Sequence, residues 1–263
     1  MIQAHVIAIS NHKGGVAKTT SVVNLGAGLH RCGQKVLLID IDPQANLTQS
    51  LGITQPELTI YEALIDQVEE LPLISIQEGF SLTPSSLDLS GAELELSNEA
   101  GREYLLREKI ETLLDQFDYI LIDCPPSLGL LTVNALTAAH EVFIPLQAEF
   151  LPTQGLAKLM EVIGKIQKRL NQTLEVGGVF LTQYDRRKIL NRDVAESLAD
   201  YFQDKLFQTK IRNNITLAEA PSQGVDVFRY SPKSPGAQDY ADLCQEILRK
   251  HQKLGVQKKQ KKT

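Results

Sequence analysis

The segment Lys13-Gly-Gly-Val-Ala-Lys-Thr-Thr20 combines cations, glycines and hydroxyls near the start of the chain. Glycines allow tight backbone turns and close approach, so that successive N–H groups can face one anion. Lys18 adds a cation, and the Thr19 hydroxyl can ligate Mg²⁺. Since an apolar run precedes the segment and a helical pattern follows it, we predict a loop that binds nucleotide phosphates. The residues expected to hold the nucleotide are Lys13, Gly14, Gly15, Val16, Ala17, Lys18, Thr19 and Thr20.

Carboxylates follow two other apolar runs. Asp40 and Asp42 end Val36-Leu-Leu-Ile-Asp-Ile-Asp42, and Asp123 ends Tyr119-Ile-Leu-Ile-Asp123. An aspartate in such a place is often only a turn residue. With the phosphate loop upstream, however, Asp42 and Asp123 become candidate Mg²⁺ ligands together with Thr19. His12 also flanks the loop, but nothing near it in the sequence prepares it as a base.

The elements that must position these residues alternate along the chain. The strand candidates are apolar throughout, as expected where both faces are buried. They lie at 5–10, 36–40, 80–84, 119–123, 141–146, 178–182 and 207–211. Amphipathic helical patterns lie at 18–31, 86–97, 102–116, 128–139, 155–170, 191–203 and 236–250. This order predicts an α/β fold, a doubly wound and mostly parallel sheet with helices on both faces, as in P-loop NTPases.

Composition and charge fit one globular domain with a basic end. The 263 residues are 43% hydrophobic and carry a net charge of −5, yet seven cations and no acid lie between Arg249 and Thr263. We predict a domain over 1–252 and a disordered basic tail over 253–263. Three distant cysteines without metal-ligand spacing indicate a reducing, cytoplasmic setting. No apolar run approaches the ~20 residues that stable membrane insertion needs.

The loop departs from the ordinary pattern G-x-x-x-x-G-K-[ST], because Ala17 replaces the second glycine and a lysine leads. The pattern K-G-G-x-x-K-[ST] resembles the deviant Walker A loop of the ParA/MinD family of ATPases. Asp40-Ile-Asp-Pro-Gln-Ala-Asn46 is similar to that family's first switch, and Asp123-Cys-Pro-Pro-Ser127 to its second. Segments 181–187, 209–224 and 230–240 look like partition-type ParA proteins, so the resemblance spans roughly 3–250.

The resemblance implies specific roles. ATP and Mg²⁺ would be the cofactors, with Lys13 crossing a homodimer to the partner's phosphates. Lys13, Lys18 and Asp42 would act in slow hydrolysis, Asp42 on the attacking water, while Asp123 would hold Mg²⁺ and Asn213 would contact the nucleotide. ATP-bound dimers of this family bind DNA non-specifically, and a cargo-bound activator of the ParB kind stimulates hydrolysis. The expected location is therefore the nucleoid.

The family's DNA-contacting residues do not all have counterparts in this chain. Where the family reads I-P-R-N-V-R-L, this chain reads Ile211-Arg-Asn-Asn-Ile-Thr-Leu217, so Thr216 replaces an arginine that often contacts DNA. Basic residues elsewhere could supply sequence-independent phosphate contacts, as could the basic tail. The candidates are Arg186, Arg187, Lys188, Arg192 and Arg212.

Three other functions share the loop. A membrane-cycling ATPase like MinD needs a C-terminal amphipathic helix, whereas Leu254 and Val256 begin no continuing apolar stripe. An iron–sulfur relative needs cysteine ligands that Cys32 and Cys124 do not provide. An ATPase that positions a protein assembly, such as a carboxysome, over the nucleoid would use the same chemistry, and the sequence does not separate it from a partition ATPase.

Overall fold

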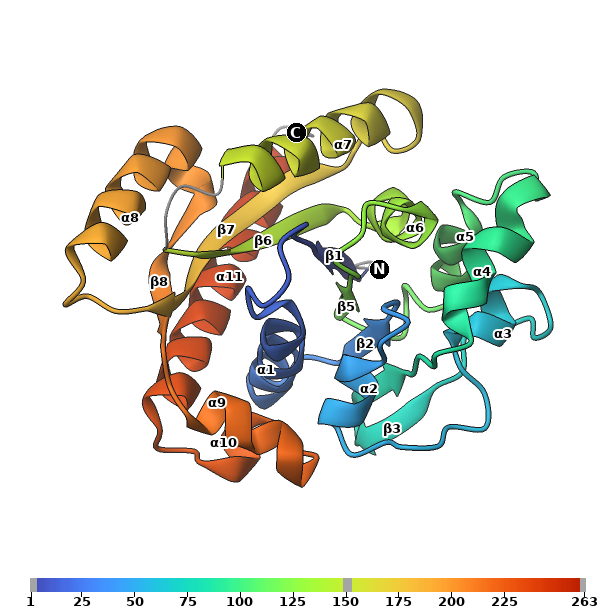
Figure 1. Cartoon of the computed structure of the whole chain (residues 1–263), viewed down its shortest axis with the longest axis horizontal. Helices are drawn as coiled ribbons and strands as arrows, with labels where there is room; N and C mark the ends of the chain where they lie inside the picture. Colours follow the sequence, from blue (N-terminus) through green and yellow to red (C-terminus); the bar gives the residue numbers. More distant parts are fainter. Residues whose placement is uncertain (1–3, 149–152, 261–263) are drawn as a thin grey trace.

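The computed structural model describes residues 4–148 and 153–260 of the chain. Within them an eight-stranded sheet runs in the order β3-β4-β2-β5-β1-β6-β7-β8 (Figure 1). Neighbouring strands are parallel except β3 and β4, which are antiparallel. The strands are β1 (His5–Ile9), β2 (Val36–Asp40), β3 (Ile74–Gln77), β4 (Phe80–Thr83), β5 (Tyr119–Asp123), β6 (Glu141–Gln147), β7 (Glu175–Tyr184) and β8 (Leu206–Arg212).

The mostly parallel α/β fold is confirmed, and seven of these strands match predicted ones to within a few residues. β3, whose residues alternate between half-buried and exposed, was not predicted. It is an edge strand joined to β4 by a tight turn in which Gly79 has φ +76°. The signal was present in the alternation around Ile74 and in the Glu78-Gly79 pair, a turn dipeptide between two short strands.

Helices cover both faces of the sheet (Figure 1). The α-helices are α1 (Lys18–Arg31), α2 (Asn46–Ser50), α3 (Ile60–Leu64), α4 (Leu89–Glu95), α5 (Leu105–Glu111), α6 (Leu130–Ala138), α7 (Thr153–Arg169), α8 (Ile189–Phe202), α9 (Thr216–Glu219), α10 (Val227–Tyr230) and α11 (Pro235–Gln260). Short 3-10 turns lie at η1 (Leu96–Asn98), η2 (Gln203–Lys205) and η3 (Ala220–Gln223). None of these helices is both long and apolar enough to span a bilayer.

Two apolar cores result from this layering. Along β1, Val6 and Ala8 join the core under α3 to α8, whereas Ile7 and Ile9 join the core under α1, α2, α10 and α11. The alternation follows from the strand period of two. Both faces are therefore apolar, which explains why the strand sequences lack the polar positions of a half-exposed sheet.

The last helix differs from its predicted span. α11 begins at Pro235 and runs to Gln260, ten residues beyond the predicted end at 250. The segment 253–260, expected to be disordered, is thus helical in the structure, and its Lys and Gln residues are good helix formers. Residues 261–263 of the predicted tail lie outside the described residues. The domain boundary after residue 252 remains a prediction.

Strand register brings the chemical residues to one edge. Asp40 of β2 pairs with Asp123 of β5, and Ile9 of β1 pairs with the same Asp123. On the other side of β1, Gln147 of β6 pairs with Thr182 of β7. The carboxyl ends of β2, β5, β1, β6 and β7 therefore form one continuous row, which is where open parallel sheets bind ligands.

One backbone contact holds the short helix α2, which follows the first carboxylate pair. Gly52, just after α2, has φ +81°, and Gly224, just after η3, has φ +66°. A Cβ built on Gly224 would lie 2.8 Å from the Cα of Gly52. Only glycine at 224 satisfies both the left-handed backbone and this approach. The contact fixes α2 against a segment about 170 residues later.

Gly224→Ala should therefore lower the free energy of unfolding by about 2–4 kcal/mol, combining left-handed strain with a clash against backbone. Gly33→Ala is the matched control, since Gly33 has φ +82° but no atom within 4 Å of a built Cβ. It should cost only about 1–2 kcal/mol. Urea denaturation measures both, and equal losses would contradict the role of the Gly52 contact.

Candidate functional site

The predicted phosphate loop connects β1 to α1. Gly15 has φ +74° and Ala17 has φ 66°, so both sit in the left-handed region. Alanine tolerates this conformation less well than glycine, at a cost of about 1–2 kcal/mol. A Cβ on Gly14 or Gly15 would meet no atom within 4 Å, so a side chain there would enter the open space beside the loop. Gly15 is needed for its backbone angle, whereas Gly14 does not have a positive φ.

The carbonyl groups of the loop are held from β6 and β7. The side-chain amides of Gln147 and Gln183 both donate to the Gly15 carbonyl oxygen, each at 2.9 Å. The Thr182 hydroxyl donates to the Val16 carbonyl oxygen at 3.1 Å. In a planar trans peptide, the N–H points away from the C=O. Holding these two carbonyls outward therefore directs the N–H groups of Val16 and Ala17 the other way.

Gln147, Thr182 and Gln183 were not among the site residues predicted from the sequence. They lie more than 130 residues after the loop and belong to no local phosphate motif. Their only signal was their position at the carboxyl ends of predicted strands. Gln183 also has φ 51°, inside β7 where its register with β8 shifts, and no sequence pattern indicated this irregularity.

The two lysines of the loop occupy different environments. Lys18 is 8% exposed, and its ammonium donates to the Lys13 carbonyl oxygen at 3.3 Å. Burial lowers the pKa of Lys18, while the nearby carboxylates of Asp123 and Asp42 oppose that shift. Lys13 is exposed, and its ammonium donates to the Gln147 side-chain oxygen at 2.9 Å. Lys18 therefore belongs to the interior of the site, and Lys13 to its outer surface.

Asp123 is a buried carboxylate that contacts the start of α1. One of its oxygens accepts from the Thr19 hydroxyl at 2.7 Å, and the other is buried with no hydrogen-bond partner among the described residues. Burial raises the pKa of Asp123 well above its usual value, and the neighbouring charge of Asp40 adds to the shift. An unpaired buried oxygen of this kind fits a cation as its missing partner.

The Asp40–Asp42 segment forms a tight loop after β2. Both oxygens of Asp40 are engaged, accepting from the backbone N–H and hydroxyl of Thr48 and from the Asp42 N–H. Burial raises the pKa of Asp40. Asp42 accepts from the Gln44 N–H at 3.0 Å, and its own carbonyl accepts from the Ser85 hydroxyl. Asp40 thus organises the loop, whereas the side chain of Asp42 is 7% exposed at its turn.

The oxygen atoms gathered here suit a Mg²⁺ ion bound together with a nucleotide. Thr19 supplies a hydroxyl and Asp123 an orphaned carboxylate oxygen, both hard oxygen ligands. Asp42 contributes charge close enough to act on Lys18. The structure therefore brings together the predicted Lys18, Thr19, Asp42 and Asp123. When bound, the metal would neutralise phosphate charge.

The segment after Asp123 touches the phosphate loop. Cys124 is fully buried, and burial raises the pKa of its thiol, so it is not placed as a reactive thiolate. The Pro126 carbonyl oxygen lies 2.9 Å from Nδ1 of His12, which flanks the loop. His12 therefore connects two loops, which is a structural role.

The remaining predicted site residues lie near the carboxyl ends of β7 and β8 and at the start of α8. Asn213 follows β8, where its N–H donates to the Tyr184 carbonyl oxygen at 3.4 Å. Among the described residues, no hydrogen bond joins Asn213 to the phosphate loop. It lines a pocket of about 620 Å³ with four cations, which are Arg186, Arg187, Lys210 and Arg212. Its predicted nucleotide contact remains a prediction.

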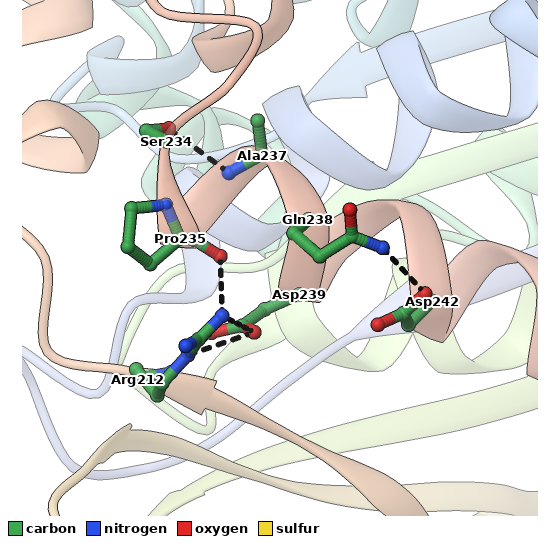
Figure 2. A network of polar contacts seen from close by, with 7 residues as sticks. All are labelled: Arg212, Ser234, Pro235, Ala237, Gln238, Asp239 and Asp242. Atoms are coloured by element: carbon green, nitrogen blue, oxygen red, sulfur yellow. Dashed lines mark hydrogen bonds and ion pairs between the residues drawn. The ribbon is translucent and has the colours of Figure 1, made fainter.

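Two of the predicted DNA-contacting arginines are engaged by carboxylates. Figure 2 shows the Arg212 guanidinium facing Asp239 of α11, with its Nε 3.0 and 2.9 Å from the two carboxylate oxygens. The Arg212 N–H also donates to Asp239 at 2.8 Å, so this pair ties β8 to α11. Arg187 pairs with Asp185 but stays 86% exposed. Arg186, Lys188 and Arg192 are exposed as well.

The strand–loop–helix phosphate site and its buried carboxylates define a P-loop ATPase. The family model described as an AAA domain matches residues 4–176. The chain is 45% identical over 249 residues to the chromosome partitioning protein ParA of Caulobacter vibrioides, covering 92% of this chain and 93% of that one. It is 44% identical over 241 residues to the chromosome-partitioning ATPase Soj of Treponema pallidum, covering 90% and 94%.

A solved structure shows the same fold with ligands. The chain superposes with a TM-score of 0.84 and 39% identity on a Mycobacterium smegmatis protein described as cobyrinic acid a,c-diamide synthase, solved with an ATP analogue and magnesium, covering 96% of this chain and 97% of that one. The chain belongs to the ParA family of P-loop ATPases. It is an ATP hydrolase whose cofactors are ATP and Mg²⁺.

Ionised Asp123 is a buried charge without full compensation, so Asp123→Asn should stabilise the protein without nucleotide or Mg²⁺ at alkaline pH, by about 1–2 kcal/mol. The gain should shrink as the pH falls through the raised pKa of Asp123, since the wild-type carboxyl group then becomes neutral. Thermal unfolding at a series of decreasing pH values measures the difference. Mg²⁺-dependent ATP hydrolysis by the variant should be lost.

Asp118→Asn is the control, because Asp118 is exposed just before β5, at the end of the strand opposite Asp123, where its side chain accepts from the Lys35 N–H. It should not stabilise the protein. A destabilised Asp123→Asn, or a gain independent of pH, would contradict the assignment of an uncompensated buried carboxylate.

Proposed function

We propose that ATP joins two copies of this chain into a dimer that binds DNA without sequence preference and moves a chromosome or plasmid during partition. Hydrolysis, stimulated by a cargo-bound partner of the ParB kind, would separate the dimer and release the DNA. Support comes from the identity to partition proteins over most of the chain. The ATP chemistry belongs to the site described above.

The observation that carries the dimer is the division of labour between the two lysines. Lys18 is buried within the loop and is available to the chain's own phosphates. Lys13 is exposed, and its ammonium is held on Gln147 at the outer side of the same loop. An outward cation beside a phosphate site is suited to the phosphates of a second copy.

The proposed DNA surface is the basic end of the sheet. Arg186, Lys188 and Arg192 are exposed around the start of α8, and Arg187 is 86% exposed although paired with Asp185. Phosphate contacts by such side chains need no base recognition and weaken with salt. Binding to chromosomal DNA would place the protein on the nucleoid.

In an Asp42→Ala background, which we expect to slow hydrolysis, ATP and Mg²⁺ should convert the chain into a stable dimer. Adding Lys13→Ala should return it to a monomer, because the cation shared between the two copies is lost. Size-exclusion chromatography with light scattering measures the mass. Lys168→Ala, at an exposed lysine in the last turn of α7, is the control. A Lys13→Ala protein that still dimerises would overturn the proposal.

DNA binding should need ATP, and its affinity should fall steeply between 50 and 200 mM salt, by about tenfold or more. Arg187→Glu should weaken binding to every sequence to a similar extent, whereas Lys168→Glu, with the same change of charge outside the cluster, should not. Fluorescence anisotropy with two unrelated duplexes measures this. Unchanged binding by Arg187→Glu would remove the basic cluster from the DNA surface.

The same preparation tests the membrane alternative. Sedimentation with anionic liposomes, with and without ATP, should leave the dimer in the supernatant. ATP-dependent pelleting together with absent DNA binding would favour the membrane-cycling function instead. Whether the cargo is DNA or a protein assembly depends on the partner, which must be found by capture on the ATP-bound dimer.

A further inference from the structure

One side chain connects the outward lysine to the phosphate loop. Gln147, the last residue of β6, accepts from the Lys13 ammonium through Oε1 at 2.9 Å. Through Nε2 it donates to the Gly15 carbonyl oxygen, also at 2.9 Å. A primary amide carries an acceptor and a donor on one planar group, so a glutamine can hold a cation and a carbonyl at the same time.

The position of Gln147 is set by the sheet rather than by the loop. It pairs with Thr182 in the β6–β7 register, and Thr182 holds the next carbonyl of the loop, that of Val16. The base of the loop is fixed from the same strand, because Asn11 donates to the Pro145 carbonyl of β6 at 2.7 Å and accepts from the Lys13 N–H at 2.9 Å. The backbone N–H of Lys13, through Asn11, and its side-chain ammonium, through Gln147, are therefore both positioned by β6.

Gln183 provides a natural comparison. Its side-chain amide donates to the same Gly15 carbonyl oxygen at the same 2.9 Å distance, from the neighbouring strand β7. The described contacts of Gln183 include none with Lys13. Both glutamines thus orient the loop peptide, but only Gln147 also accepts a hydrogen bond from the Lys13 ammonium among the described contacts.

We propose that Gln147 is a positioning residue for Lys13, holding its ammonium in the orientation from which it reaches the phosphates of a second copy. This inference rests on the dimer proposed above. An ammonium has three N–H donors, so Lys13 can keep its bond to Gln147 while it donates to phosphate oxygens. A lysine side chain that is ordered before association loses less conformational freedom when the dimer forms.

The test separates dimer formation from nucleotide binding. With a saturating non-hydrolysable ATP analogue and Mg²⁺, Gln147→Ala should raise the dimer dissociation constant about tenfold in sedimentation velocity, whereas Gln183→Ala should change it less than about twofold. In a Lys13→Ala background, where no dimer is expected, both glutamine substitutions should weaken analogue binding to the monomer by the same few-fold factor, since both release the Gly15 carbonyl.

Two further variants keep the result interpretable. Gln147→Met retains the length and volume of the side chain but neither polar atom. It should therefore raise the dimer dissociation constant as Gln147→Ala does, and it serves as the test if the smaller alanine disturbs folding. Gln147→Glu keeps an acceptor for the Lys13 ammonium but cannot donate to the Gly15 carbonyl once it is ionised. It should therefore weaken analogue binding to the monomer, while changing the dimer dissociation constant at saturating analogue less than Gln147→Ala does.

Failure of this inference differs from failure of the dimer itself. If Lys13→Ala dimerises like the wild type, the sandwich proposal fails and takes the role of Gln147 with it. If Lys13→Ala is monomeric while Gln147→Ala and Gln183→Ala dimerise alike, only the role of Gln147 is overturned. A larger loss for both Gln147→Ala and Gln147→Met than for Gln183→Ala supports the inference.

Discussion

A loop can turn its N–H groups toward an anion only if the carbonyl oxygens of the same peptides find partners elsewhere. In this protein those partners come from side chains at the ends of two strands outside the loop. Gln147 and Gln183 hold the Gly15 carbonyl, and Thr182 holds that of Val16. The phosphate site therefore depends on how β6 and β7 align beside β1, and the motif alone does not build it.

The second constraint is the charge buried behind the loop. Asp40 and Asp123 pair across β2 and β5, so strand register forces two carboxylates together in a dry environment. The fold satisfies Asp40 with Thr48 and the backbone, but leaves one oxygen of Asp123 without a described partner. Burying a carboxylate oxygen without a partner lowers stability, and a bound cation would supply that partner. Binding sites commonly keep such an unfavourable group because it is needed for function.

Specific contacts tie the segments after the strands to one another and to the helices. His12 joins the phosphate loop to the segment after β5 through the Pro126 carbonyl oxygen. Gly52 and Gly224 join the segment after β2 to the C-terminal half by backbone contact. The Arg212–Asp239 pair fixes the end of β8 to α11.

The sequence by itself determined the sheet, the phosphate loop and the acids at its edge, because buried parallel strands and a glycine–lysine loop leave strong local patterns. It located α1 and β5 to the residue, but extended the disordered tail over part of α11 and overlooked β3, whose short alternating pattern is weak. Only the tertiary structure decided which residues complete the site. Gln147, Thr182 and Gln183 act through register between strands, and register is a long-range property that no local spacing encodes.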